Sequence, residues 1–147
     1  MGGKEVKDPF IETITHGLDP IALIIRAEYD KPGIQFFTPA NFSQQLAFIK
    51  HPSGHKIAAH VHNLQLRQVL YTQEVLFLRR GKVKVKLYSS DRKWIGSRIL
   101  NSGDLILLCG GGHSFRMLEE TSMIEIKQGP YAGENDKITF EVNGCDK

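Results

Sequence analysis

The chain has 147 residues, of which 41% are apolar, 24% charged and 9% aromatic. This length and composition suit a single globular domain, and they exclude a disordered, collagen-like, coiled-coil or membrane protein. The formal net charge of +3 is too small to indicate nucleic acid or a membrane surface as a partner. We therefore expect one domain over residues 1–147.

The compartment is predicted from the apolar runs and the cysteines. Residues 1–10 mix charges without an apolar core, so they do not resemble a secretory signal. The longest apolar runs, 21–25 and 105–109, are far shorter than the ~20 residues that cross a bilayer. Cys109 and Cys145 form no CxxC pair, and we interpret them as free thiols of a cytoplasmic protein. Cys109 is expected to be buried and inert.

Short apolar or alternating segments separated by turn residues predict strands along most of the chain. Strands are expected at 21–28, 34–38, 45–50, 56–62, 74–79, 81–88, 94–100, 105–109, 114–118, 123–128 and 138–142. One short helix is expected near 39–45, and a tight hairpin at Arg80-Gly81. Many short strands with frequent turns predict an all-β sandwich or barrel, with residues 44–142 as the barrel and residues 1–43 as an N-terminal arm of extra strands.

Segment 81–88 gives the clearest strand signal. Apolar Val83, Val85 and Leu87 alternate with lysines, so the lysines are interpreted as the solvated face of a strand rather than as a nucleic-acid contact.

The N-terminal arm would pack on the barrel or on a partner subunit. Because sheet edges are commonly covered or paired, we expect a homodimer.

Two of the six histidines, His60 and His62, form an H-V-H motif. Residues two apart on a strand point to the same face, so both imidazoles would reach one metal ion. An HxH pair alone is a weak signal, and its context strengthens it. Gly54 precedes His60, Glu74 precedes Gly81 with six residues between, and Gly103 opens the segment that ends in Gly110-Gly111-Gly112-His113.

This order of glycines, HxH, glutamate and a third histidine resembles the cupin superfamily over residues 54–117. The resemblance implies a double-stranded β-helix (jelly-roll) barrel and a divalent transition metal, with Fe, Mn, Ni, Co, Cu and Zn all compatible. The implied metal ligands are His60, His62, Glu74 and His113. Eleven residues separate His62 from Glu74, more than in most cupins, so a longer segment is expected at the barrel mouth.

Further residues are candidates for the pocket. Arg67 could bind a substrate carboxylate or phosphate, although a solvent-exposed side chain is the commoner role of such an arginine. Gln73 and His55 are similar candidates at the mouth. Phe115 and Met117 share the face of His113 by strand parity and would form an apolar wall. The three glycines at 110–112 are interpreted as a tight turn that places His113, because no helix or Lys-Ser/Thr follows as in a phosphate loop.

Glu125 and Lys127 also share one strand face. They form either a solvated ion pair or, if the face points inward, an acid/base pair.

Three functions remain open from these residues. The resemblance implies a metal-dependent enzyme acting on a small polar metabolite, as an isomerase or epimerase of the sugar type or as an Fe-dependent dioxygenase. The second is a non-catalytic module that binds a small ligand or a metal. The third is a metal-free isomerase that works through a His/Tyr or His/Asp pair, which the retained histidines disfavour.

Overall fold

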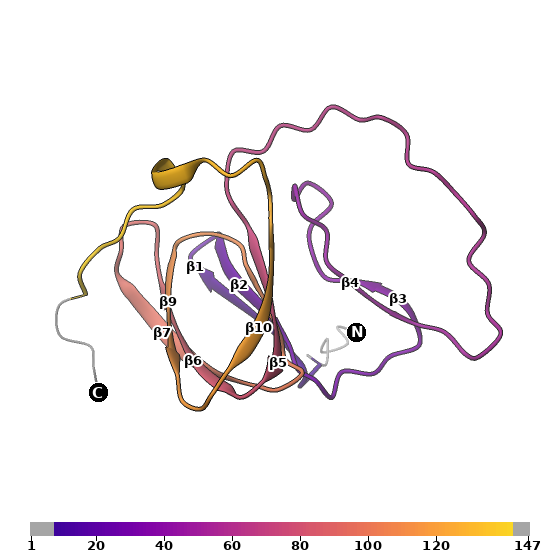
Figure 1. The fold of residues 1–147 in the computed structure, drawn as a ribbon, viewed down its shortest axis with the longest axis horizontal. Helices are drawn as coiled ribbons and strands as arrows, with labels where there is room; N and C mark the ends of the chain where they lie inside the picture. Colours follow the sequence, from indigo (N-terminus) through magenta and orange to yellow (C-terminus); the bar gives the residue numbers. More distant parts are fainter. Residues whose placement is uncertain (1–7, 143–147) are drawn as a thin grey trace, which may run out of the picture. The chain divides into compact units, whose positions relative to one another are not determined.

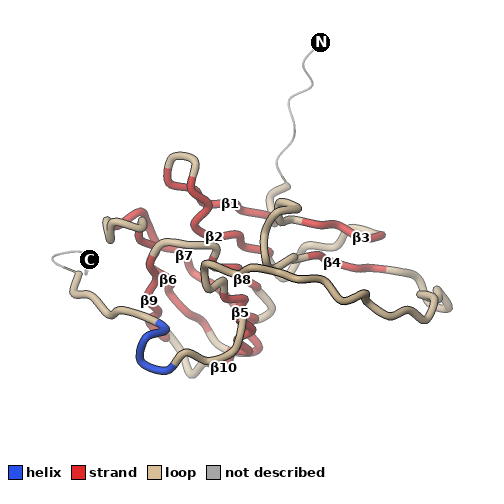
Figure 2. Tube along the Cα trace, turned by 90° about the horizontal axis from the view of Figure 1, so that it is seen from above, coloured by secondary structure: helices blue, strands red, loops and turns tan. Residues whose placement is uncertain are grey.

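The computed structural model describes residues 8–142 and is all-β, as the sequence predicts. About 44% of these residues lie in strands; the range holds no α-helix and only a four-residue 3-10 helix. The strands are β1 (Ile11–His16), β2 (Asp19–Ile25), β3 (Gly33–Phe36), β4 (Ala47–Lys50), β5 (Glu74–Arg80), β6 (Lys82–Tyr88), β7 (Trp94–Asn101), β8 (Leu105–Leu108), β9 (Gly112–Met117) and β10 (Ser122–Lys127), followed by η1 (Gly133–Asp136) (Figures 1 and 2). Within this range no helix is long and apolar enough to cross a bilayer.

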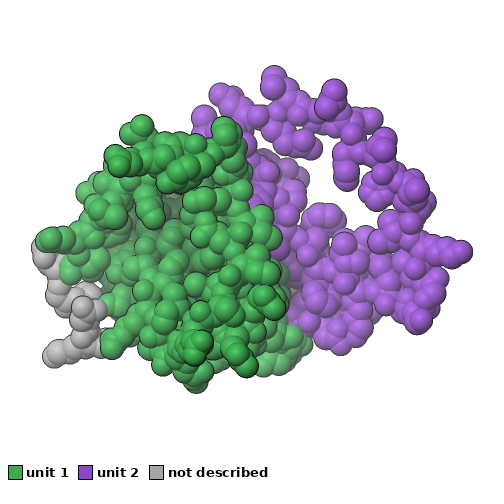
Figure 3. All heavy atoms as spheres, in the orientation of Figure 1, with its two compact units in different colours: residues 1–28, 72–147 green, residues 29–71 purple. Residues whose placement is uncertain are grey.

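The chain divides into two compact units, coloured separately in Figure 3. Unit 1 comprises the described parts of residues 1–28 and 72–147, and unit 2 comprises residues 29–71. Unit 1 holds a five-stranded sheet in the order β1-β2-β8-β5-β10 and a three-stranded sheet in the order β7-β6-β9. Unit 2 holds the antiparallel pair β3-β4. No sheet among the described residues closes into a barrel, and the single domain over residues 1–147 stays a prediction.

The core of unit 1 lies between its two sheets. Ile24 and Ile106 of the five-stranded sheet and Val83 and Val85 of β6 are fully buried, and they belong to one apolar cluster. Each sheet therefore turns one apolar face to the other, as an antiparallel sandwich requires, and Figure 1 shows the two sheets packed against each other. The lysines of β6 alternate with these buried residues, which confirms their place on the outer face.

The hairpin predicted at Arg80-Gly81 is wrong. The strand β5 pairs with β8 and β10, whereas β6 pairs with β7 and β9, so the chain passes from one sheet to the other at this point. Gly81 has a φ of 92°, and a Cβ there would lie 2.3 Å from the carbonyl oxygen of Glu120. Glycine is thus needed for the crossing, and the sequence signal for a turn was correct while the pairing inferred from it was not.

The helix predicted near 39–45 is also absent from the structure, which has turns and bends there. The side-chain amide of Gln45 donates to the carbonyl oxygens of Pro39 (2.9 Å) and Phe42 (3.0 Å). These carbonyls are therefore bonded by a side chain instead of by a continuing helical backbone.

Two predicted strands are wrong, and one strand was missed. Residues 56–62 and 138–142 form no strand in the structure, whereas β1 was not predicted. Alternating residues at 56–62 indicate strand propensity, but a strand forms only where a neighbour accepts its backbone hydrogen bonds, and this segment has no strand partner in the described chain. Residues 138–142 are instead fixed by a side chain, because the ring of Phe140 packs edge-on against Tyr88 at 5.4 Å.

The buried carboxylate of Asp104 organises the connection between β7 and β8. Asp104 is 2% exposed and accepts hydrogen bonds from the guanidinium of Arg26 (2.9 Å) and from the backbone N–H groups of Ala27 (3.0 Å) and Asn101 (2.9 Å). One side chain thus ties β2, β7 and β8 together at one end of the sandwich.

Replacing this carboxylate should destabilise the fold. In Asp104→Ala, three donors lose their acceptor and Arg26 loses its partner, so we expect the free energy of unfolding to fall by about 2–4 kcal/mol. Urea denaturation monitored by circular dichroism measures the change. Asp30→Ala is the matched control, because Asp30 pairs with Lys50 at the surface and should cost less than about 1 kcal/mol. Equal losses in the two variants would contradict the role given to Asp104.

Candidate functional site

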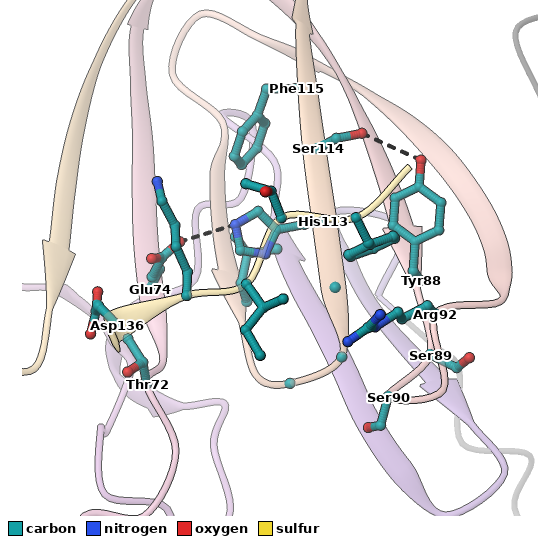
Figure 4. Close-up of a pocket in the computed structure, with 18 of the residues that line it drawn as sticks. Thr72, Glu74, Tyr88, Ser89, Ser90, Arg92, His113, Ser114, Phe115 and Asp136 are labelled. Carbon is teal, nitrogen blue, oxygen red and sulfur yellow. Dashed lines mark hydrogen bonds and ion pairs between the residues drawn. The ribbon is translucent and has the colours of Figure 1, made fainter. Parts of the chain in front are cut away.

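Unit 1 contains a cavity of about 720 Å³, within the size range of small-molecule sites. Its walls come from β5, β9 and β10, from the turn after β6, from the glycines at 110–112 and from the segment 136–142. Figure 4 shows the residues that line it. The site below is built from those side chains.

Strand parity directs Glu74 and His113 into the cavity. On β5, Leu76 and Leu78 belong to the buried core, so Glu74 lies on the same inner face one step further along. On β9, His113 and Phe115 share a face, and Phe115 packs against the core. The ring centroids of His113 and Phe115 are 5.3 Å apart, so Phe115 forms an apolar wall beside the imidazole.

Glu74 and His113 meet directly across the sandwich. The Nε2 atom of His113 lies 3.2 Å from Oε2 of Glu74, and the two side chains are 30% and 20% exposed (Figure 4). This hydrogen bond from His113 is the largest cause that holds the pKa of Glu74 below its ordinary value of 4.5, although burial acts in the opposite direction. The charges of His113, Lys127 and Lys137 lower it further. Glu74 is therefore a carboxylate at neutral pH.

The cause of this shift gives a test in metal-free protein. In His113→Ala the pKa of Glu74 should rise, because the hydrogen bond is lost while desolvation by the cavity wall remains. A carboxylate with a lowered pKa stabilises the fold above its unfolded pKa, and this contribution is lost as the pH falls through the lowered value. Carboxyl ¹³C NMR titration measures the pKa directly. An unchanged or lower value in the variant would contradict the assignment.

Lys127 links Glu74 to two further acids. Glu74 and Lys127 are paired in the register of β5 and β10, and Nζ of Lys127 lies 3.9 Å from Oε1 of Glu74. The same ammonium lies 3.3 Å from Asp136 and 3.4 Å from Glu125. Hydrogen bonds to Asp136 and then to Glu125 raise its pKa, so it remains charged. Glu125 and Lys127 both line the cavity, and they form an ion pair that solvent reaches, with side chains 48% and 31% exposed.

The arrangement supports proton transfer. The hydrogen bond to Glu74 places a proton on Nε2 of His113, and no other hydrogen bond of this imidazole is formed within residues 8–142. The Nδ1 atom then keeps a lone pair that can accept a proton from a ligand. Ionised Glu74 stabilises the imidazolium that forms when Nδ1 accepts a proton.

The glycine turn before β9 places His113, as the sequence analysis expects. Gly111 has a φ of 67°, and a Cβ there would come within 2.2 Å of the carbonyl oxygen of Tyr88. Gly112 opens β9 opposite Tyr88 in the register of β6. The close approach of this turn to the end of β6 fixes the start of β9, and with it the position of the imidazole.

The other candidates predicted from the sequence lie elsewhere. Gln73 is buried beside the cavity, with its backbone N–H donating to the side chain of Gln128 at 2.7 Å, and Met117 is 48% exposed at the end of β9; neither lines the cavity. His55, His60, His62 and Arg67 belong to unit 2. The rings of His60 and His62 lie edge-to-face at 5.3 Å.

His55 stacks on His51 at 3.8 Å, and Arg67 is exposed. The structure therefore brings Glu74, His113 and Phe115 together at the cavity. In the part of the chain that it describes, no three His, Cys, Asp or Glu side chains form a metal-binding group.

Sequence reasoning missed much of the cavity wall, including its polar residues Tyr88, Arg92 and Asp136. Asp136 belongs to η1, and no motif marks it. Tyr88 ends β6, where a bulge interrupts the alternation that would have placed it. Arg92 occupies a turn and has a positive φ of 66°, a conformation that no sequence rule assigns to an arginine.

Cys109 is a half-buried free thiol that precedes the glycine turn. Burial raises its pKa to about 11, so it is almost entirely protonated at neutral pH. This supports the interpretation of Cys109 as inert. Cys145 lies outside the described residues.

Comparison of the chain with protein-family models, with curated proteins and with solved structures gives no match. The cupin resemblance therefore depends on the sequence motifs alone.

Proposed function

We propose that the cavity of unit 1 binds a small polar metabolite and that Glu74 and His113 form the reactive part of a metal-dependent centre there. The observation that carries this proposal is their contact at 3.2 Å, on the wall of a cavity of about 720 Å³. These two residues come from different strands and are two of the four ligands that the sequence motifs imply. A structural ion pair alone would not need a cavity of ligand size beside it.

The metal-dependent form adds His60 and His62 as ligands, on the grounds of the HxH motif. A carboxylate and neutral imidazoles are donors that suit Fe, Mn, Ni, Co, Cu or Zn. Bound metal would act as a Lewis acid on a ligand oxygen. In this form His113 and Glu74 would hold the metal, and in the metal-free form they would orient the ligand and accept or return its proton. The reaction classes are those of a sugar-type isomerase or epimerase, or of an Fe-dependent dioxygenase.

The jelly-roll form of the fold belongs to the same proposal. Two facing antiparallel sheets in unit 1 support it, because a double-stranded β-helix is built from two such sheets. We also propose a reducing cytoplasm as the compartment, since Cys109 is a free thiol.

A metal-free acid/base enzyme is the second candidate. Tyr88, His113 and Asp136 line one cavity without any contribution from the HxH motif, and these are the residue types that the metal-free alternative requires. A binding module without catalysis is the third. Proton transfer in the presence of a chelator separates the second candidate from the first.

The homodimer is a further part of this proposal. Leu64 and Leu66 are fully exposed, at 101% and 103%, and both sheets of unit 1 have open edges. Exposed apolar side chains and open edges are commonly covered by a partner. Sedimentation equilibrium should give twice the chain mass of 16.6 kDa. A particle of 16.6 kDa at micromolar concentration would contradict the dimer.

Elemental analysis of untagged protein tests the proposed function, followed by oxygen uptake by the Fe(II)-loaded form. One equivalent of a transition metal is expected. Oxygen uptake with a panel of hexoses and hexose phosphates indicates a dioxygenase. Its absence, together with deuterium exchange into the same panel in D₂O, indicates an isomerase or epimerase. If the protein holds no metal and deuterium exchange continues in the presence of a chelator, the metal-free acid/base enzyme replaces the metal-dependent one.

A further inference from the structure

A second part of the cavity wall carries positive charge. Arg92 lines the cavity together with Ser90 and the glycines at 110–112. In Figure 4, Arg92 and Ser90 lie on the other side of His113 from Glu74 and Asp136. The carboxylates and the guanidinium of Arg92 therefore lie in different parts of one cavity. This separation of charge favours a ligand that carries a negative group at its Arg92 end.

The turn between β6 and β7 holds Arg92 in an uncommon conformation. Its φ of 66° is in the left-handed region, where glycine or asparagine is the usual residue. The turn is closed by a hydrogen bond from the backbone N–H of Arg92 to the carbonyl oxygen of Ser89 (2.9 Å) and by one from Lys93 N–H to Ser89 Oγ (3.1 Å). A strained position filled by arginine indicates that the side chain itself is required there.

No acid among residues 8–142 pairs with this arginine. The adjacent Asp91 is engaged by Lys93, whose Nζ lies 2.6 Å from its carboxylate, and by the hydroxyl of Ser89. Among residues 8–142, Arg92 forms no ion pair; its guanidinium instead lies over the ring of Phe140, 5.7 Å from the centroid. Figure 4 shows the side chain extending from its turn toward the strand of His113. A guanidinium over the face of an aromatic ring can still donate its N–H groups, which lie in its own plane, to an oxoanion.

The glycines at 110–112 place bare backbone in the cavity wall, and protein atoms fill the space that a side chain at Gly111 or Gly112 would need. Gly112 lies so close to Phe140 that a Cβ would come within 3.0 Å of the ring, and Gly111 excludes a side chain by its contact with Tyr88. The wall beside Arg92 is thus bare backbone on one side and an aromatic ring on the other. A ligand can approach both closely.

We infer that Arg92 forms an anion-binding subsite for a phosphate or carboxylate group of the ligand. This inference rests on the proposed function, because it identifies the ligand class of the same cavity as a small anionic metabolite. Its anionic group binds at Arg92, and its reacting carbon–hydrogen or carbon–oxygen bond faces His113. The guanidinium binds two oxygens of the anion in a fork, which fixes the orientation of the rest of the ligand.

Binding of inorganic phosphate and of acetate, each titrated at constant ionic strength by ¹⁵N NMR, tests the subsite. Phosphate has no bond that the enzyme could activate, so this binding is independent of catalysis. Arg92→Gln should weaken binding of whichever anion the wild type binds more tightly by at least tenfold. Arg116→Gln is the matched control, because Arg116 lies on β9 outside the cavity wall and should leave binding unchanged.

Arg92→Gly is the second variant, because glycine adopts the positive φ without strain and the protein should be no less stable than the wild type. Loss of anion binding in this variant is then due to the missing guanidinium. Tighter binding of phosphate assigns the subsite to phosphorylated ligands, and tighter binding of acetate to carboxylates. Equal binding by the wild type and both Arg92 variants, or an equal loss in Arg116→Gln, would overturn the subsite. Failure of deuterium exchange with anion binding intact would instead overturn only the proposed function.

Discussion

The double variant His60→Ala/His62→Ala is expected to purify with less than about a tenth of a metal ion per chain, because two ligands cannot complete a four-ligand centre. Wild-type protein should hold one equivalent. Each imidazole must be neutral to bind, so metal affinity should fall as the pH drops and protons compete with the metal for the ring nitrogens. Elemental analysis of untagged protein at pH 8 and pH 5.5 measures both effects.

The matched control for this variant is His51→Ala/His55→Ala. This pair also lies in unit 2, with its rings stacked at 3.8 Å, and no motif assigns it to metal. It should leave the metal content unchanged. Glu74→Gln should weaken metal binding less than the double variant does, because it removes one ligand and leaves three. If the double variant at 60 and 62 binds metal as tightly as the wild type, the proposed ligand set is wrong.

The second large effect concerns proton transfer at His113. In His113→Ala, deuterium exchange into hexose phosphates should fall by about 100-fold or more, because the only imidazole of the cavity wall is removed. Glu74→Gln should also slow the exchange, since the imidazolium loses its counter-charge at 3.2 Å. Mass spectrometry of the recovered sugar phosphate, with and without EDTA, gives the rates.

The control for this measurement is His51→Ala, which should exchange at the wild-type rate. Exchange that EDTA abolishes supports the metal-dependent form, and exchange that it spares supports the metal-free form. A His113→Ala protein that exchanges deuterium as fast as the wild type would remove His113 from the reaction altogether.

Strand positions were predicted well where alternation is strict. The pattern of Val83, Val85 and Leu87 depends only on local burial, and the structure places all three in the core. Strand pairing was not predictable in the same way. Arg80-Gly81 has the residues of a hairpin, but the chain crosses between sheets there because Gly81 packs against the backbone of Glu120. That contact comes from a segment some forty residues away in sequence, which no local pattern reports.

The site was predictable only where local sequence patterns mark its residues. Glu74 and His113 fall at positions of the sequence motif, and the alternation of their strands turns both side chains inward. The sequence therefore named both residues of the pair that lies in contact in the structure. The partners of Lys127 and the role of Arg92 depend on an irregular segment and on a strained turn. The strand predicted at 56–62 failed because strand formation needs a neighbour as well as an alternating pattern.

The central claim is that Glu74 and His113 belong to one metal centre with His60 and His62. Paramagnetic broadening by Mn²⁺, added below one equivalent to metal-free ¹⁵N-labelled protein, tests it most directly. We predict that the amide signals of Glu74 and His113 broaden first and together with those of His60 and His62, and that the His60→Ala/His62→Ala variant loses this effect. Broadening confined to other acidic or histidine residues, with the signals of Glu74 and His113 unchanged, would contradict the claim.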